Sequence, residues 1–317
     1  MKINNRKSFV TGIKGKTLSN TEKFFLKKYK PWGVILFSRN IHSIKQTQNL
    51  TQQIKKIFKD NNYPILIDEE GGKVSRLSKF LDSSTFSAEF FGKLLKENPN
   101  KFHIFYDVYI KQICYILKIL GINLNTVPVL DIRRKNANSV IGNRAYSSNK
   151  LIVSKMGNIC INSFFNNKIG TMMKHIPGHG LSKVDSHKKK PIIKKSIKYL
   201  KNFDFFPFKN KKCLFAMTAH IVYQKIDPYN AATHSKKVIK LIRNNIGFKN
   251  LIISDDISMK ALKNSISINT KKAFIAGCNL VLHCNGKLSE MKEVARNSPT
   301  VSKFIIKKTS QFNDIIS

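Results

Sequence analysis

The sequence predicts an α/β fold, a single (β/α)8 barrel of the TIM type that occupies residues 1–317. Three observations support this prediction. Short apolar runs alternate with longer helical patterns, polar residues follow several of the apolar runs, and no glycine-rich nucleotide-binding motif follows the first run. Repeated strand-then-helix units indicate a parallel sheet, and barrels of this type often exceed 250 residues as one domain.

Eight apolar runs are expected to form buried parallel strands, because strands covered on both faces are apolar throughout. The runs are 9–13, 33–37, 64–67, 123–129, 169–173, 214–217, 251–253 and 280–282. This number of strands favours a closed barrel. A doubly wound sheet that binds nucleotides would carry a G-x-G-x-x-G or Walker A sequence, and the chain has neither.

Helices are expected between these strands. Residues 44–57 place apolar side chains on one helical face, with Ser43 available as the N-cap. Residues 101–120 form another such pattern. Further helices are expected over 235–245 and 270–276, each followed by a glycine that can end it.

The chain is strongly basic, with 57 Lys and Arg against 18 Asp and Glu, a formal net charge of +39. Only eight of these 57 residues are Arg, whose planar group is the better reader of phosphates and bases. The lysines are spread along the whole chain, so we expect a solvated basic surface and no nucleic-acid partner. An anionic partner or substrate is the alternative, and the densest cluster, 187–198 (HKKKPIIKKSIK), is where such an anion would bind.

Cysteine usage and hydropathy indicate a cytoplasmic protein, expected to be a monomer without a membrane partner. Five widely spaced cysteines contain no C-x-x-C pair, which argues against a disulfide framework and a zinc site. The longest apolar runs stop far short of the roughly 18 residues that a membrane span needs. The N-terminus has no secretory apolar region.

The scarce acidic residues are concentrated where chemistry is expected. Seven of the 18 lie in four short motifs: Asp68, Glu69, Glu70, Asp131, Asp185, Asp255 and Asp256. Polar groups also end the runs at 169–173 and 214–217. In a barrel, the loops at the carboxyl ends of the strands build the active site, so these groups are expected to converge on one pocket. Any one of them taken alone has helix capping as an equally simple explanation.

Three segments carry a resemblance to a known family. Residues 67–76 (IDEEGGKVSR) resemble D-x-E-G-G-R-V-x-R, and 174–180 (KHIPGHG) followed by 185–187 (DSH) resemble K-H-F-P-G-H-G…D-S-H. Residues 253–259 (ISDDISM) resemble S-D-D-L-S-M. With further blocks between residues 33 and 286, the chain resembles glycoside hydrolase family 3, and within it the NagZ-type β-N-acetylhexosaminidases.

The resemblance implies a retaining hydrolysis through a covalent glycosyl-enzyme, which needs a carboxylate nucleophile and a proton donor. Asp255 matches the nucleophile. His187 matches the proton donor and Asp185 its partner. A histidine suits this work, because an unperturbed imidazole titrates near ~6.5 and can give and take a proton near neutrality.

The resemblance also assigns the residues that would hydrogen-bond the hydroxyls of N-acetylglucosamine: Asp68, Arg76, Arg144, Lys174 and His175. Asp256 is interpreted as a cap or supporting group, with catalysis as the alternative, and His179 as a structural histidine. Glu70 and Asp131 are interpreted as anchors. The family implies no metal and no organic cofactor.

The expected activity is release of β-linked N-acetylglucosamine from peptidoglycan fragments, chiefly N-acetylglucosaminyl-1,6-anhydro-muropeptides, in cell-wall recycling. A phosphorylase that passes the sugar to phosphate is the alternative within the same fold, since a histidine donor tolerates an anion that a carboxylate would repel. A lysine-rich nucleic-acid-binding protein without activity is a third, weaker hypothesis.

Overall fold

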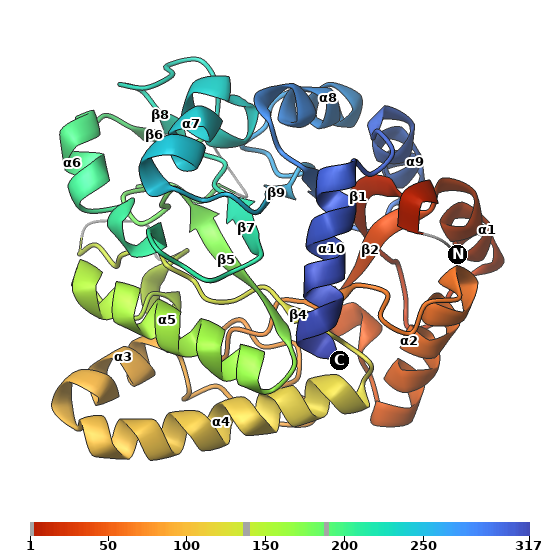
Figure 1. Cartoon of the computed structure of the whole chain (residues 1–317), viewed down its shortest axis with the longest axis horizontal. Coiled ribbons are helices and arrows are strands. Elements are labelled where there is room, and N and C mark those ends of the chain that lie inside the picture. The colour runs from red at the N-terminus through yellow and green to blue at the C-terminus, as the bar shows by residue number, and fades with distance from the viewer. Residues whose placement is uncertain (1–2, 136–139, 187–189) are drawn as a thin grey trace.

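The computed structural model describes residues 3–135, 140–186 and 190–317 and contains a closed barrel of eight parallel strands (Figure 1). Around the barrel the strands follow the order β1-β10-β9-β7-β5-β4-β3-β2. Their bounds are β1 Lys7–Gly12, β2 Pro31–Leu36, β3 Ile65–Ile67, β4 Leu124–Asn125, β5 Gly170–Ile176, β7 Phe215–Thr218, β9 Leu251–Asp256 and β10 Leu280–His283. The predicted TIM-type barrel is confirmed, and each strand overlaps one of the eight apolar runs.

Alternation along the strands divides their side chains between two cores. In β9, Leu251 and Ile253 belong to the core inside the barrel, whereas Ile252 packs outward against the helices. In β5, Met172 points inward and Met173 outward in the same way. All of these side chains are buried, which explains why the strands are apolar throughout rather than alternating.

The C-terminal helix α10, Lys303–Ile316, closes the end of the barrel at which the strands begin. The indole Nε1–H of Trp32 in β2 donates to Thr309 Oγ1 at 2.9 Å. Phe312 meets Phe215, the first residue of β7, edge to face with ring centroids 5.5 Å apart. The base of the barrel is therefore filled by apolar side chains, and the opposite end is left for polar groups.

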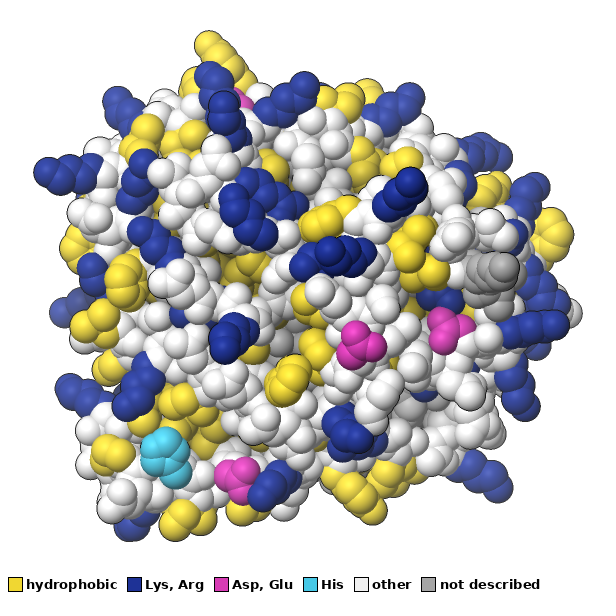
Figure 2. Space-filling view, viewed as in Figure 1, with side chains coloured by type: hydrophobic (Ala, Val, Ile, Leu, Met, Phe, Trp, Pro, Cys, Tyr) yellow, Lys and Arg dark blue, Asp and Glu magenta, His cyan; other side chains and the backbone are white. Residues whose placement is uncertain are grey.

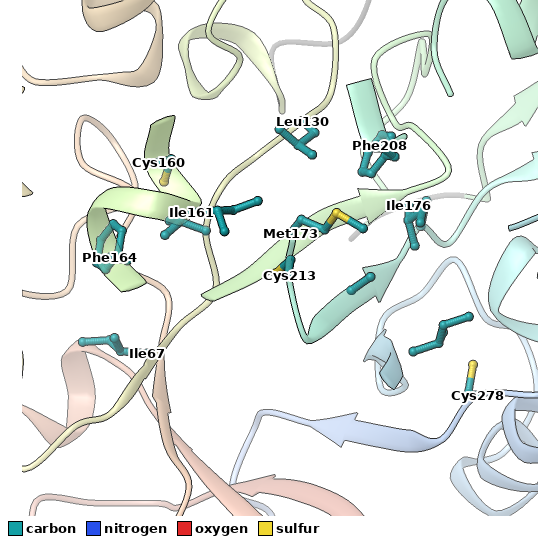
Figure 3. Close-up of a cluster of buried hydrophobic side chains, with 14 of the residues drawn as sticks. Ile67, Leu130, Cys160, Ile161, Phe164, Met173, Ile176, Phe208, Cys213 and Cys278 are labelled. Carbon is teal, nitrogen blue, oxygen red and sulfur yellow. The ribbon is translucent and has the colours of Figure 1, made fainter. Parts of the chain in front are cut away.

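The other helices surround the barrel. They are α1 Asn20–Tyr29, α2 Ile44–Phe58, α3 Ala88–Glu97, α4 Pro99–Ile119, α5 Lys150–Asn166, α6 Ile197–Asn202, α7 Lys236–Leu241, α8 Ile266–Ala276 and α9 Leu288–Asn297. The predicted helix start at Ser43 is confirmed, because its side chain accepts a hydrogen bond from the N–H of Gln46. Figure 3 shows Cys160, Ile161 and Phe164 of α5 in the buried cluster that also contains Met173 of β5.

Three local features differ from the sequence prediction. The strand expected over 123–129 is only two residues long, since Pro128 lacks the N–H that a longer ladder would use. The helix expected over 235–245 changes after Leu241 into a π-helix, Ile242–Ile246. A small parallel pair, β6 Ile192–Ile193 and β8 Val222–Tyr223, was not predicted, because two-residue strands carry no periodicity.

Basic side chains are distributed over the whole face seen in Figure 2, separated by apolar and uncharged groups. Acidic side chains are sparse on that face. No helix in the described part of the chain combines the length and the apolar character that crossing a bilayer requires.

Candidate active site

The polar residues singled out in the sequence meet at the carboxyl ends of the strands. Asp68 follows β3, Lys174 and His175 lie near the end of β5, and Asp255 and Asp256 end β9. In a parallel barrel all these ends open at one mouth. These residues of the site therefore come from three separate strands, which a closed barrel holds in fixed register.

Lys174 is the centre of a buried charged cluster. Its ammonium nitrogen lies 2.9 Å from Asp68 Oδ1, 2.7 Å from Glu70 Oε1 and 2.8 Å from Thr126 Oγ1. Glu70 is held from its other side by Arg144, whose Nε and Nη2 donate to the two carboxylate oxygens at 2.7 and 2.8 Å. Two cations and two anions thus neutralise each other, which is what permits charges to be buried here.

The cluster fixes the protonation of its members. Burial opposes ionisation of Asp68, but Lys174 and Arg76 outweigh it and lower the pKa of this carboxyl. The pKa of Glu70 is lowered strongly, because Arg144 and Lys174 overcome the effect of its burial. Burial would lower the pKa of Lys174, yet Asp68 and Glu70 raise it. Near neutral pH the site therefore presents ionised groups to a polar ligand.

Arg76 borders the same cluster in a more exposed position. Its guanidinium lies 3.8 Å from Asp68 Oδ2 and 5.5 Å from the ring centroid of Phe37. Its main-chain N–H donates to Glu69 Oε2 at 2.6 Å. Glu69 is buried and also accepts from the N–H of Leu77, so it fixes the segment that carries Arg76. Glu69 was expected near the pocket, but this supporting contact to Arg76 and Leu77 was not predicted, although its place in the D-E-E-G-G motif was the available signal.

A second cluster is organised by Asp131. Its Oδ2 accepts from Nδ1–H of His175 at 2.6 Å, and its Oδ1 accepts from the main-chain N–H of His179 at 2.6 Å. Burial raises the pKa of Asp131, but His175 and further hydrogen bonds more than reverse this and lower it. An ionised Asp131 keeps the hydrogen of His175 on Nδ1 and so fixes the tautomer of that ring.

The two neighbouring aspartates at the end of β9 have different surroundings. Asp255 continues the inward series of Leu251 and Ile253, which directs it to the mouth of the barrel, and it is half-buried. Asp256 accepts from the N–H and Oγ–H of Ser258 at 3.0 and 2.8 Å, which makes it the cap of the turn that follows.

His220 ties the end of β9 to the loop after β7. Its Nε2–H donates to the main-chain carbonyl of Asp256 at 2.9 Å, and its Nδ1 lies 2.7 Å from Thr233 Oγ1. Burial lowers the pKa of His220, so the ring is neutral and Nδ1 accepts from the threonine hydroxyl. Neither this contact nor Thr233 was anticipated, because the partners lie on separate loops.

His187 lies outside the described residues, so its contacts are left aside. Asp185 is described, and its charge acts on Lys73. The pKa of Lys73 is lowered by its burial and by Arg144, while the charges of Glu70 and Asp185 act in the opposite direction. Asp185 therefore lies within electrostatic reach of Lys73. Among the residues that the structure describes, no group of three or more His, Cys, Asp or Glu side chains is placed to hold a metal ion.

Curated relatives share most of the length of the chain. A β-hexosaminidase of Nitrosomonas eutropha is 33% identical over 287 residues, covering 86% of this chain and 79% of the relative. A β-hexosaminidase of Psychromonas ingrahamii is 32% identical over 288 residues, covering 88% and 82%.

Solved structures agree with this similarity. Native NagZ from Neisseria gonorrhoeae superposes with a TM-score of 0.83 at 27% identity, covering 99% of this chain and 91% of that one. A glycoside hydrolase family 3 β-N-acetylglucosaminidase from Paenibacillus shares the fold, with a TM-score of 0.85 at 24% identity, and this chain spans 62% of its length. The family model described as the glycosyl hydrolase family 3 N terminal domain matches residues 7–309, and the chain belongs to this family.

Proposed function

We propose that this glycoside hydrolase is a retaining β-N-acetylhexosaminidase that removes terminal β-linked N-acetylglucosamine. The observation that carries the proposal is the position of Asp255, a strand-end carboxylate directed to the same mouth as the ionised cluster of Asp68, Lys174 and Arg144. The curated relatives named β-hexosaminidases support the choice of sugar. So does the NagZ structure from Neisseria gonorrhoeae in complex with N-trifluoroacetyl-D-glucosamine, at 27% identity.

In the proposed mechanism Asp255 is the nucleophile. Its carboxylate attacks the anomeric carbon while the glycosidic oxygen departs with a proton from the imidazolium of His187. A covalent glycosyl-aspartate results. His187, now neutral, then takes a proton from water, whose oxygen attacks the anomeric carbon and releases Asp255. Asp185 holds the imidazole and stabilises its charged form.

The charged clusters are proposed to bind the sugar ring. Asp68 offers carboxylate oxygens to ring hydroxyls, and Lys174 and Arg144 offer N–H donors at its side. His175, whose tautomer Asp131 fixes, and Arg76 complete the set. Because Lys174 is already held by two carboxylates, its ammonium group is oriented before the substrate arrives, and little ordering remains for the reaction to supply.

The proposed natural substrates are peptidoglycan fragments, chiefly N-acetylglucosaminyl-1,6-anhydro-muropeptides, cleaved by a monomeric cytoplasmic enzyme during cell-wall recycling. The resemblance to NagZ-type enzymes supports this proposal. The basic surface does so as well, since muropeptides carry carboxylates and the chain has a formal net charge of +39.

The test is hydrolysis of 4-nitrophenyl N-acetyl-β-glucosaminide by the wild type and three variants, with and without phosphate. Asp255→Asn is expected to abolish turnover and His187→Ala to reduce it strongly. Asp107→Asn, an exposed carboxylate on α4, should leave it unchanged. A sugar 1-phosphate formed in phosphate buffer would identify a phosphorylase instead. Full activity of Asp255→Asn would disprove the proposed mechanism.

A further inference from the structure

Ser186 is buried although it lies in a lysine-rich segment. Its side chain is 3% exposed, and its hydroxyl lies 3.1 Å from Nε2 of His179. Its main-chain carbonyl accepts from the N–H of Ala261 at 3.2 Å. One residue is thus held both by the turn after β5 and by the turn after β9, the strand that ends in Asp255.

The partner of this hydroxyl, His179, is itself fixed in place. Its main-chain N–H donates to Asp131 Oδ1 at 2.6 Å. On either side of it the turn packs closely against other backbone. A Cβ on Gly180 would come within 2.0 Å of the carbonyl oxygen of Ile132, and Gly178 has a φ of +140°. The turn therefore has little room to move, and His179 is a rigid support for Ser186.

The His179 ring is neutral, because its burial and the neighbouring His175 lower its pKa to about 4. A neutral imidazole has one donor and one acceptor nitrogen, so either direction of the bond to the serine hydroxyl is chemically available. Nδ1 of His179 is buried and meets no hydrogen-bond partner among the described residues. Ser186 therefore supplies the side-chain hydrogen bond that this ring makes within the described part of the chain.

Because Ser186 is bonded directly to Asp185, the contacts of Ser186 restrain the backbone position of Asp185. The two Cα atoms are about 3.8 Å apart, as in any trans peptide. Asp185 acts electrostatically on Lys73, which also responds to Glu70 and Arg144. Docking of Ser186 therefore restrains the backbone of Asp185, whose charge acts on Lys73.

We propose that Ser186 is a positioning residue for proton transfer, holding the segment of Asp185 against the barrel through His179. The proposal rests on the proposed function, in which Asp185 orients the proton donor. Loss of the hydroxyl would leave sugar binding and nucleophilic attack in place and impair only protonation of the departing oxygen. The effect should therefore depend on how much protonation the leaving group needs.

The experiment compares two substrates in Ser186→Ala, measuring kcat/KM, which reports the first chemical step. Phenyl N-acetyl-β-glucosaminide has a poor leaving group and needs a proton. Because general acid catalysis contributes roughly 10²–10⁴-fold, the variant is expected to lose about 10- to 100-fold on it. The 2,4-dinitrophenyl glycoside departs without a proton, and its kcat/KM should change by less than about threefold. Equal losses on the two substrates, or no loss on either, would overturn the proposal.

Two further variants separate positioning from folding. Ser298→Ala removes another buried hydroxyl, which donates to Val294 O on α9, and should change neither substrate's kcat/KM. His179→Phe keeps a ring but no nitrogen. Combined with Ser186→Ala, it should add nothing to the leaving-group effect of the single serine change, because both remove one hydrogen bond. If the effects of Ser186→Ala and His179→Phe on kcat/KM multiplied in the double variant, the proposed contact would be contradicted.

Failure of the proposed function gives a different result. A folded wild type that cleaves neither aryl glycoside would refute the hexosaminidase assignment and, with it, any role of Ser186 in that reaction. A wild type that cleaves both, but whose Ser186→Ala variant shows no leaving-group dependence, would refute only the role of Ser186.

Discussion

The two ends of the barrel are filled by opposite kinds of side chain. At the base, Trp32, Phe215 and Phe312 fill the interior with aromatic rings. At the mouth, Asp68 and Lys174 continue the same strand framework with paired charges. Apolar packing is non-directional and stabilises the fold in many arrangements, whereas buried charges are tolerated only where each one is paired in a specific geometry. Changes at the base should therefore affect mainly the free energy of unfolding, and changes at the mouth mainly catalysis.

The largest expected effect is on stability. Phe312→Ala removes a fully buried ring from the base, and such a change costs about 3–5 kcal/mol of unfolding free energy. The kcat/KM of the folded fraction should stay within about twofold of the wild type, because the mouth is untouched. Urea denaturation and aryl glycoside hydrolysis measure the two quantities. A tenfold fall in kcat/KM in fully folded protein would show that the two ends are coupled.

A substitution at the mouth should reduce kcat/KM more than it reduces stability. Asp68→Asn keeps the shape of the side chain but removes its charge, and Lys174 retains Glu70 as a partner. Hydrogen bonds to charged groups are worth about 1.5–3 kcal/mol, so kcat/KM should fall roughly 10- to 100-fold. The melting temperature should fall by only a few degrees. Asp82→Asn, at an exposed loop carboxylate, is the control. If Asp68→Asn lost stability without losing activity, the proposed separation between a stabilising base and a catalytic mouth would be wrong.

The pH dependence of stability offers a finer comparison. The pKa of His179 is about 4 in the folded protein, below the usual value near 6.5, so the unfolded chain binds the extra proton between these values. The contribution of His179 to stability is therefore present above pH 6.5 and is lost as the pH falls towards 4. Wild type should lose stability relative to His179→Phe by about 1 kcal/mol per pH unit in this window. If the unfolding free energies of the wild type and of His179→Phe changed in parallel between pH 4 and pH 7, this prediction would be wrong.

The smallest effect is expected away from both ends. Lys111→Gln breaks an exposed ion pair with Asp107 on α4, in which the charged atoms lie 2.7 Å apart. Such pairs contribute about 0.3–0.5 kcal/mol, so neither the melting temperature nor kcat/KM should change measurably. A clear loss of activity would show that the outer helices influence the mouth.

The sequence predicted the barrel more completely than the site. Apolar runs mark strands covered on both faces, which is why all eight barrel strands were located. The short length of β4 and the existence of the β6–β8 pair depend on local backbone hydrogen bonds and were not predicted. The charged residues of the cluster were predicted individually, whereas Thr126 was not. The connections among them were not predicted either, because Asp68, Thr126 and Lys174 are separated by 58 and 48 residues and meet only through closure.

The burial and the contacts of Ser186 also could not be predicted from the sequence. A serine among lysines has no periodicity to indicate burial, and its partner Ala261 lies 75 residues away on another loop. The D-S-H motif directed attention to Asp185 and His187 because they carry titratable groups. The residue between them became visible only through its contacts.

The way the barrel closes has a consequence for its synthesis. β1 pairs with β10, where Phe9 aligns with Val281, and α10 seals the base with residues after 302. While the chain emerges from the ribosome, one edge of β1 stays unpaired until β10, at residues 280–283, has been made. Unpaired edges and uncovered aromatic rings are where growing chains associate wrongly. The nascent chain thus depends on α10 to cover the rings at its base, and chaperones that bind exposed apolar segments should hold it longest just before this helix appears.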